Sequence, residues 1–362
     1  MRGSREEIID FVRGLAVIDM MLVHYRDFFE SVPLIIVKKL IGFSDFAIEG
    51  FIFSAGFAVG YHYFSKFRTN RKSTTRRLLY RALNIVKIQY LMILTIGLFS
   101  AVLLGKIVTG SDTIAQYIVK SLLFLKQEGL LHILPTFVPL LILSIPMLHI
   151  LVRGYGVVLL IVSLCFFAVG NQNPNIFSLG EKPIFPVILW QLYFVIGVLW
   201  GKRYFSTGKL LPGGPGTHLF VASAVLFIMM FVYFGHHFIP EWGYLRQIYG
   251  IKVSKFPLNY FGFLYHGAIL YMIICLVTMG QKRGLPIIKP GSFIMLFGRN
   301  SLLTFVIHVY FVKFIVILNH FVPVTALMSP VIVGLNVITG IVAAKYVENR
   351  QERLTSYKVA TK

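Results

Sequence analysis

Apolar runs of roughly 17 to 25 residues recur along this 362-residue chain, and that length lets an α-helix cross the hydrocarbon core of a bilayer. Hydrophobic residues make up 57% of the sequence and the mean hydropathy is +0.76, far above the balance found in a soluble domain. A transmembrane β-barrel would instead show short segments of alternating apolar and polar residues. The sequence therefore predicts an all-α, polytopic integral membrane helical bundle.

About ten apolar segments define the predicted transmembrane helices. They cover residues 8–26, 45–65, 83–104, 134–152, 155–170, 186–201, 218–238, 257–279, 293–318 and 329–346. No repeat, low-complexity tract or soluble segment interrupts them, so we expect a single membrane domain over residues 1–362. The first segment carries charged residues and lacks a cleavage site of small residues, so we expect it to remain as the first helix.

The net charge of +21 follows a pattern that predicts topology. Most Lys and Arg residues lie near both chain ends and in alternate loops, and cytoplasmic loops carry this excess. We therefore expect both termini in the cytoplasm and segment 170–185 outside. The densest basic stretch, residues 66–81, is explained by topology, although it could also bind the phosphates of a coenzyme. Nucleic acid is not expected as a partner, because the charges are dispersed between membrane segments.

The two cysteines do not indicate thiol or metal chemistry. Cys165 and Cys275 both fall inside apolar runs, where thiols behave as small hydrophobic groups. We therefore predict neither a disulfide framework nor a metal site. Gly56 and Gly60 form a GxxxG pair, a pattern typical of closely packed membrane helices.

The first predicted helix carries a cation and an imidazole on one face. Arg13 and His24 are eleven residues apart, which at about 100° per residue returns to nearly the same face and separates them by roughly 16 Å. The second helix places Glu49 one turn below Asp45, at a depth similar to that of His24. A carboxylate there could orient the imidazole and stabilise its charged form, as a general base that takes a hydroxyl proton requires. The geometry suits acyl transfer to a sugar hydroxyl.

Each of these residues also has a structural interpretation. A histidine near a helix end is often a hydrogen-bonded packing residue, and a glutamate such as Glu49 can simply pair with a lysine. Arg13 could hold an anionic donor, or it could form an ion pair with Asp10 one turn earlier. Ionisable groups in a bilayer cost roughly 2.5 to 3.5 kcal/mol each, so several of them at one depth favour a functional site.

A second polar group opens the ninth predicted helix. Arg299, Asn300 and Ser301 lie at its start, and His308 follows two turns further on. Arg299 is placed where a cytoplasmic anion would arrive. From charge alone, however, it could equally be an anchor that obeys the positive-inside rule.

Two N-terminal runs resemble the opening of the OpgC family, which succinylates osmoregulated periplasmic glucans: IIDFVRGLAVIDMMLVHY at 8–25 and GFSDFAIEGFIFSAGFAVGYHY at 42–63. The resemblance continues through LPTFVPLLILSIP at 134–146, FPVILWQLYFVIGVLWG at 185–201 and LFGRNSLLTFVIH at 296–308. It therefore covers nearly the whole chain. The spacing of Arg13 and His24 is also similar to that in acyltransferase family 3, a wider group of membrane enzymes that acylate extracytoplasmic glycans.

The resemblance implies an inner-membrane O-acyltransferase that moves a succinyl or acetyl group from cytoplasmic acyl-CoA to a hydroxyl of a periplasmic or cell-envelope glycan. The implied partners are the lipid bilayer, acyl-CoA as donor substrate and the glucan, with no bound cofactor. Matching by position makes His24 the catalytic base, with Glu49 and Asp45 beside it. The same matching assigns these residues to substrate binding: Arg13, Trp190, Gln191, Arg299, Asn300, Ser301 and His308.

A membrane transporter of an anionic metabolite or glycan precursor is the alternative. A carrier would also place Asp, Glu, Arg and His inside its bundle. It would often show inverted repeats and helices broken by Gly or Pro at corresponding positions, and neither is clear in this sequence.

Overall fold

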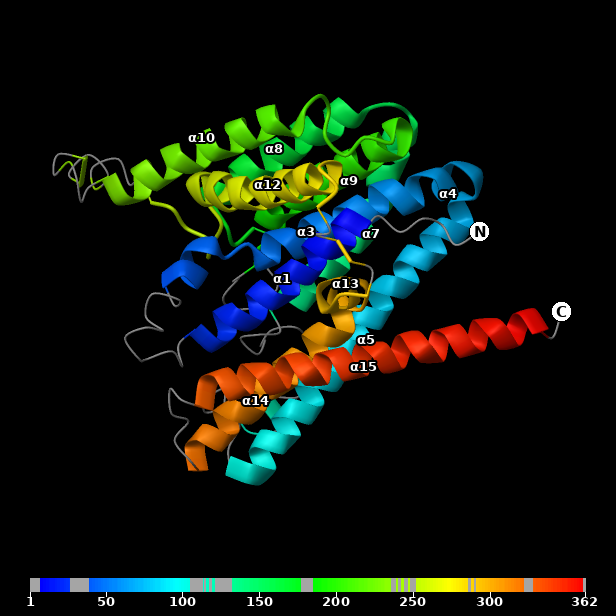
Figure 1. Cartoon of the computed structure of the whole chain (residues 1–362), viewed down its shortest axis with the longest axis vertical. Helices are drawn as coiled ribbons and strands as arrows, with labels where there is room; N and C mark the ends of the chain where they lie inside the picture. The colour runs from blue at the N-terminus through cyan, green and yellow to red at the C-terminus, as the bar shows by residue number, and fades with distance from the viewer. Residues whose placement is uncertain are drawn as a thin grey trace. The chain divides into compact units, whose positions relative to one another are not determined.

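The computed structural model of the chain describes residues 7–26, 39–104, 113, 115–116, 119–120, 132–176, 185–235, 239, 242–243, 247, 252–285, 288–289, 291–321 and 328–360. These residues are overwhelmingly helical (Figure 1). Within the same ranges there is no β-strand, only an isolated bridge between Lys255 and Leu258. The predicted all-α class is thus confirmed for the described part of the chain.

Every predicted helix coincides with helical residues in the structure. In chain order the helices are α1 (Glu7–Tyr25), α3 (Ala47–Ala58), α4 (Phe64–Thr69), α5 (Arg71–Leu104), α7 (Ile133–Val152), α8 (Gly156–Gln172), α9 (Val187–Thr207), α10 (Pro215–Phe234), α12 (Tyr260–Lys282), α13 (Phe293–Arg299), α14 (Ser301–Phe321) and α15 (Met328–Ala360). A five-residue π-helix, η2 (Val59–Tyr63), joins α3 to α4. The predicted ninth helix is divided at Asn300 into α13 and α14.

Among the described residues, seven helical segments are long and apolar enough to cross a membrane. They are Lys39–Thr69, Arg71–Gly97, Ile133–Val152, Pro215–Val232, Tyr260–Lys282, Ser301–Phe321 and Pro330–Leu354. The apolar helix α8 is shorter, at 17 residues, and α1 contains Asp10, Arg13 and Asp19 within its apolar run. A multi-pass membrane protein is therefore supported, whereas the predicted count of ten spans is not confirmed.

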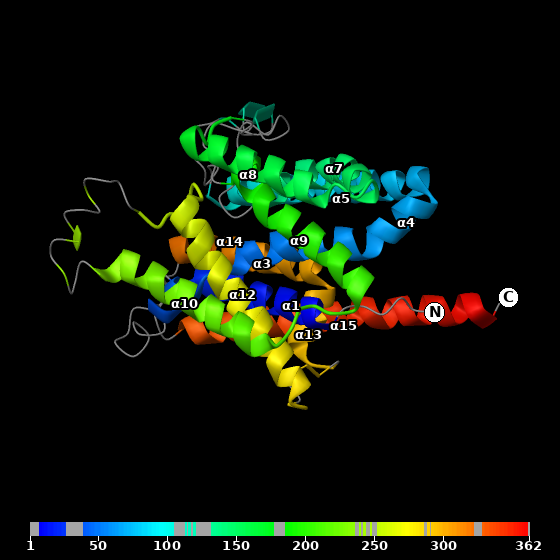
Figure 2. The same ribbon diagram turned by 90° about the horizontal axis from the view of Figure 1, so that it is seen from above.

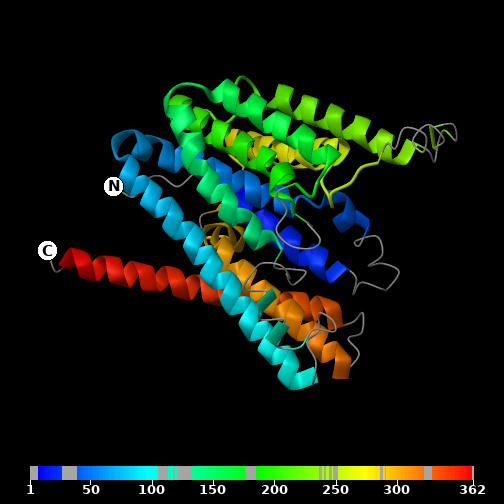
Figure 3. The same ribbon diagram turned by 180° about the vertical axis from the view of Figure 1, so that it is seen from behind.

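The chain divides into two compact units. The first comprises residues 1–47 and 280–362, and in it α1 packs against α13 and α14 lies along α15. The C-terminal part of α15 continues well past the N-terminal end of α14 (Figure 3). The second unit comprises residues 48–279, where α5 lies along α7 and α8 along α9 (Figure 2). The prediction of a single domain stays a prediction.

Glycines bring two helices of the second unit into backbone contact. A Cβ on Gly56 or Gly60 would collide with the backbone of α9, and a Cβ on Gly197 or Gly201 would collide with the backbone of α3. Two small-residue pairs therefore face each other, one on each helix, which is how GxxxG patterns allow helices to approach closely. The predicted packing role of Gly56 and Gly60 is confirmed.

We expect Gly197→Ala to destabilise the protein, because the added methyl group must push α3 away from α9. Overpacking of this kind costs about 1 to 3 kcal/mol. The measurement is thermal unfolding of the purified protein in detergent. Gly216→Ala is the matched control, since a Cβ there meets no atom within 4 Å. Equal melting temperatures for the two variants would contradict the packing role.

Candidate functional site

Two histidines from distant parts of the sequence meet in the first unit. His24 lies in the last turn of α1 and is half-buried, whereas His308 of α14 is wholly buried. Nδ1 of His24 lies 2.7 Å from Nε2 of His308. The ring planes differ by 2° and the ring centroids are 5.0 Å apart. Because the two nitrogens are much closer together than the centroids, the rings meet edge to edge in a hydrogen bond and are not stacked face to face. The structure thus brings these two predicted site residues together.

Asn336 of α15 extends this pair into a chain of three side chains. Its Nδ2 lies 2.7 Å from Nδ1 of His308 and donates to the Tyr25 hydroxyl at 3.0 Å. Asn336 and His308 are fully buried, and the Tyr25 ring stands edge-on to the His308 ring. Among the described residues, Oδ1 of Asn336 has no hydrogen-bond partner. His24 is therefore the accessible end of a buried hydrogen-bonded chain.

The amide orientation of Asn336 determines which nitrogen of His24 carries a proton. When the NH₂ group faces His308, Nδ1 of His308 accepts, its Nε2–H donates to Nδ1 of His24, and the His24 proton sits on Nε2. When the amide carbonyl faces His308 instead, Nδ1–H of His308 donates to that carbonyl, and Nε2 of His308 accepts from Nδ1–H of His24. Nε2 of His24 then bears a free lone pair. The two orientations have nearly the same shape. The chain can therefore present His24 either as a donor or as a base.

Asp45 lies in the same unit as His24, immediately before α3. The negative charge of Asp45 favours the charged form of the His24 ring, whereas the positive charge of Arg26 opposes it. Oδ2 of Asp19 accepts a hydrogen bond from the backbone N–H of Phe46 at 2.8 Å. This buried bond ties the segment that carries Asp45 to α1. Asp45 is therefore an acidic group positioned to influence His24.

Glu49 belongs to the second unit and is paired with a lysine. Its Oε2 lies 3.1 Å from Nζ of Lys255, and the side chains are 0% and 8% exposed. Lys255 comes from the segment before α12, which the sequence assigned to a loop. The lysine pairing left open for Glu49 is therefore present. The further prediction that Glu49 orients His24 stays a prediction.

Arg13 forms the ion pair that the sequence offered as one of its two roles. Its Nη1 lies 3.1 Å from Oδ1 of Asp10 and donates to the carbonyl of Gly298 at 3.4 Å. A Cβ on Gly298 would collide with the carbonyl of Asp10, so α1 and α13 are in close contact here. Arg13 thus ties these two helices together, and its contact with a donor stays a prediction.

The polar residues at the α13–α14 junction share a carboxylate that the sequence did not identify. Nε of Arg299 lies 3.4 Å from Oε1 of Glu348 on α15, and Nδ2 of Asn300 donates to the same oxygen at 3.2 Å. Ser301 follows as the first residue of α14 and is half-buried. The junction is therefore a hydrogen-bonded cluster within the first unit, and its predicted binding of substrate stays a prediction.

Trp190 and Gln191 lie side by side on α9 in the second unit. Oε1 of Gln191 accepts from the Ser163 hydroxyl at 2.7 Å, and Nε2 donates to the Ser163 carbonyl at 2.8 Å. The Gln191 amide therefore links α9 to α8. Trp190 is fully buried between Phe185 and Tyr193, and within the described residues its indole N–H has no hydrogen-bond acceptor. The predicted substrate contacts of both residues stay predictions.

Three arginines surround a cavity at the start of α5. Arg76, Arg77 and Arg81 line it together with Tyr63 and Tyr80, and its volume is about 410 Å³. Arg81 donates to the Tyr63 hydroxyl at 3.2 Å, and none of the three arginines pairs with a carboxylate in the described ranges. Guanidinium groups bind phosphate oxygens in a bidentate manner. The cavity therefore has the chemistry of a phosphate site.

Metal ligands are not clustered in the part of the chain that the structure describes. It contains no group of three or more His, Cys, Asp or Glu side chains that could hold a metal ion. Both cysteines are free thiols, with Cys275 buried and Cys165 exposed.

Comparisons with known proteins bear on the whole chain. A family model described as "OpgC protein" matches residues 5–352. Searches of curated proteins and of solved structures give no match.

Proposed function

The chain belongs to the OpgC family, and we propose that it is a membrane O-acyltransferase that moves a succinyl or acetyl group from cytoplasmic acyl-CoA to a hydroxyl of a periplasmic or cell-envelope glycan. The family match supports a glucan-modifying acyltransferase. One structural observation carries the proposal, namely the half-buried His24 at the open end of the buried chain through His308 to Asn336. A partly accessible imidazole oriented by a second buried group is the arrangement that general bases use.

His24 acts as the general base in this proposal. Its Nε2 takes the proton of the acceptor hydroxyl while the hydroxyl oxygen attacks the thioester carbonyl of the donor. The new C–O ester bond forms, the C–S bond breaks, and coenzyme A leaves as a thiolate that receives the proton from His24. Asp45 stabilises the imidazolium that exists between these two proton transfers, because its negative charge acts on the ring.

Asn336 is a positioning residue for this base. Its carbonyl must face His308 for Nε2 of His24 to be free of its proton, so the amide selects the active tautomer. Tyr25 shares the Asn336 amide and holds α15 against the end of α1. The sequence offered one signal for Asn336, a single amide within an otherwise apolar run, where polar groups are costly.

We expect Asn336→Leu to lower kcat for glycan acylation by at least about tenfold, since partners that orient a functional histidine typically contribute this much. KM and acyl-CoA affinity should change little, because Asn336 touches neither substrate. Asn336→Asp should retain more activity than Asn336→Leu, since a carboxylate oxygen can only accept from His308. Steady-state kinetics of both variants provide the measurement. Equal losses in the two variants, or a loss confined to KM, would contradict the tautomer role.

In this proposal the protein lies in an inner membrane and the donor approaches from the cytoplasm. The positive-inside pattern supports a cytoplasmic position for residues 66–81 and for both termini. Arg13 and Arg299 were predicted to bind it, and each already pairs with a carboxylate. Arg76, Arg77 and Arg81 pair with no described carboxylate and surround a cavity of about 410 Å³. The phosphates of acyl-CoA therefore bind at this cavity in our proposal.

The double variant Arg76→Gln/Arg77→Gln should weaken acyl-CoA binding at least about tenfold, because hydrogen bonds to charged groups contribute roughly 1.5 to 3 kcal/mol each. Titration calorimetry on purified protein measures the affinity. Arg153→Gln is the matched control, since Arg153 is an exposed arginine that lies outside the cavity. An unchanged affinity in the double variant would leave residues 66–81 as a determinant of topology only.

Transfer of label tests the proposed function itself. Purified protein in nanodiscs is given succinyl-CoA labelled in the acyl group together with an oligosaccharide glucan. We expect label in the glucan and release of coenzyme A. The transporter alternative predicts that an anionic metabolite or glycan precursor crosses a proteoliposome membrane without covalent change, and this outcome would overturn the proposal.

A further inference from the structure

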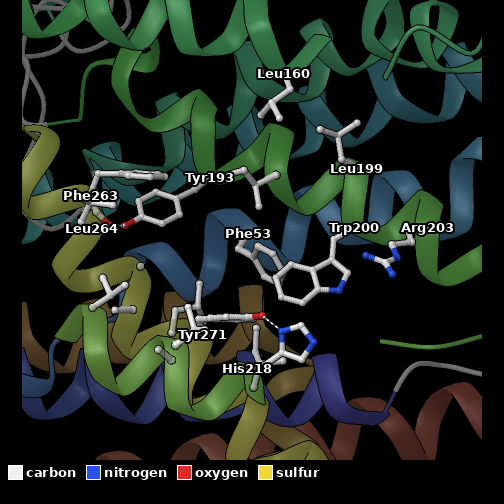
Figure 4. A pocket seen from close by; sticks show the side chains of 18 of the residues that line it. Phe53, Leu160, Tyr193, Leu199, Trp200, Arg203, His218, Phe263, Leu264 and Tyr271 are labelled. Carbon is white, nitrogen blue, oxygen red and sulfur yellow. Dashed lines mark hydrogen bonds between the residues drawn. The ribbon is translucent and has the colours of Figure 1, made fainter. Parts of the chain in front are cut away.

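A second cavity lies within the second unit, between α9, α10 and α12 (Figure 4). Its volume is about 570 Å³, and its walls are largely apolar. The larger lining side chains include Phe53, Leu160, Leu199, Trp200, Phe263 and Leu264. This site is separate from the residues that the proposed acyl transfer uses.

The polar side chains in the cavity wall are hydrogen-bonded to other residues of the protein, with one exception. The Tyr271 hydroxyl donates to Nδ1 of His218, and Nε2–H of His218 donates to the carbonyl of Pro212 (Figure 4 shows the first bond). The exception is Arg203, whose guanidinium makes no ion pair or hydrogen bond with the residues that the structure describes. The cavity thus offers a ligand an apolar surface and one available cation.

The residues of α9 that line the cavity cover a length close to that of one bilayer leaflet. Arg203 and Tyr193 both line it, and they are ten residues apart on α9, a rise of about 15 Å. Half of a hydrocarbon core about 30 Å thick has the same length. Arg203 follows Lys202 near the C-terminal end of α9, in a region that the charge pattern assigns to the cytoplasmic surface. With this predicted topology, the cation lies at the level of the lipid phosphates, and the apolar wall extends from it towards the bilayer centre.

Helix α10 separates the cavity from the lipid on one side. Its outer face exposes Phe220 and Phe227, at 74% and 73%, as a helix that contacts lipid tails does. Its inner face lines the cavity with the smaller side chains Ala222 and Val225. In a membrane, lipid tails would therefore lie against the outer face of α10, one helix away from the cavity.

We propose that this cavity binds one acyl chain of a membrane phospholipid with an anionic headgroup, and that the Arg203 guanidinium binds the phosphate group of this lipid. The lipid acyl chain lies against the apolar wall from Trp200 to Tyr193. The guanidinium favours a headgroup with net negative charge over a zwitterionic one. His218 and Tyr271 do not bind the headgroup, because their hydrogen bonds are already used.

Native mass spectrometry of the full chain, released from nanodiscs of equal parts phosphatidylglycerol and phosphatidylcholine with matched chains, tests this site. We expect one retained phosphatidylglycerol, preferred over phosphatidylcholine by about tenfold. Arg203→Gln should remove the preference, and Ala222→Phe should reduce retention of both lipids by filling the cavity. Arg153→Gln and Ala224→Phe are the matched controls, because neither position lines the cavity.

A lipid with brominated acyl chains shows where the lipid binds. Phosphatidylglycerol with brominated chains should quench tryptophan fluorescence of the wild-type protein, and Trp200→Phe should lose most of that quenching. Equal retention of the two lipids by the wild-type protein would overturn the proposal, as would wild-type retention in both Arg203→Gln and Ala222→Phe. Displacement of bound phosphatidylglycerol by succinyl-CoA would assign the cavity to the donor and would also overturn it.

Discussion

His24→Ala should abolish glycan acylation and leave acyl-CoA binding near the wild-type level. A general base contributes typically 10² to 10⁴-fold to a rate, so transfer should fall by at least about a hundredfold. The donor should still bind, because the imidazole acts on the acceptor hydroxyl and not on the coenzyme phosphates. Initial rates of label transfer from succinyl-CoA to glucan, at equal amounts of purified protein, measure the first effect. Calorimetric titration with succinyl-CoA measures the second.

His320→Ala is the control for this experiment. His320 lies on the same helix as His308, but it is exposed and outside the hydrogen-bonded chain. Its loss should leave transfer unchanged. Thermal unfolding of His24→Ala shows whether the variant is folded. Transfer within a few-fold of the wild-type rate in His24→Ala would exclude the mechanism and leave His24 as a packing residue.

The helices were predictable because hydropathy is a local property of the sequence. All ten predicted segments coincide with helical residues, yet several boundaries differ for identifiable reasons. The break at Asn300 falls in a run of only three polar residues, 299–301, which is too short to divide an apolar segment of transmembrane length. Helix α15 extends to Ala360, far past the predicted end at 346, because a charged sequence ends the apolar run without ending the helix. Hydropathy thus predicts where helices lie better than where they stop.

The site residues were predictable as types, but their partners were not. His24 and His308 were both expected in the site, yet their hydrogen bond joins positions 284 residues apart, and no spacing rule predicts such a contact. Asn336, Lys255 and Glu348 were missed for the same reason, since each meets its partner only after folding. Charged residues were recognised by the cost of placing them in a bilayer, and that cost does not identify which neighbour offsets it.

Lys255→Met should destabilise the protein more than Gly197→Ala, the substitution at the contact between α3 and α9. Lys255 and Glu49 are almost completely buried, with Nζ and Oε2 3.1 Å apart. Removing the lysine leaves a buried carboxylate without this counter-ion, and breaking a buried pair in this way costs about 3 to 5 kcal/mol. The double variant Lys255→Met/Glu49→Leu should regain most of the lost stability, because an apolar pair of similar volume replaces both charges. Thermal unfolding in detergent measures all three proteins.

Lys252→Met is the matched control, since Lys252 is exposed and only three residues earlier in the same segment. A melting temperature for Lys255→Met equal to that of the control would show that the ion pair does not stabilise the second unit. The double variant also separates the two roles assigned to Glu49. If Glu49 serves only as the counter-ion of Lys255, the stable double variant keeps the wild-type rate of acyl transfer. If Glu49 also orients His24, that variant is stable and yet transfers slowly, because the imidazolium has lost a carboxylate that stabilises it.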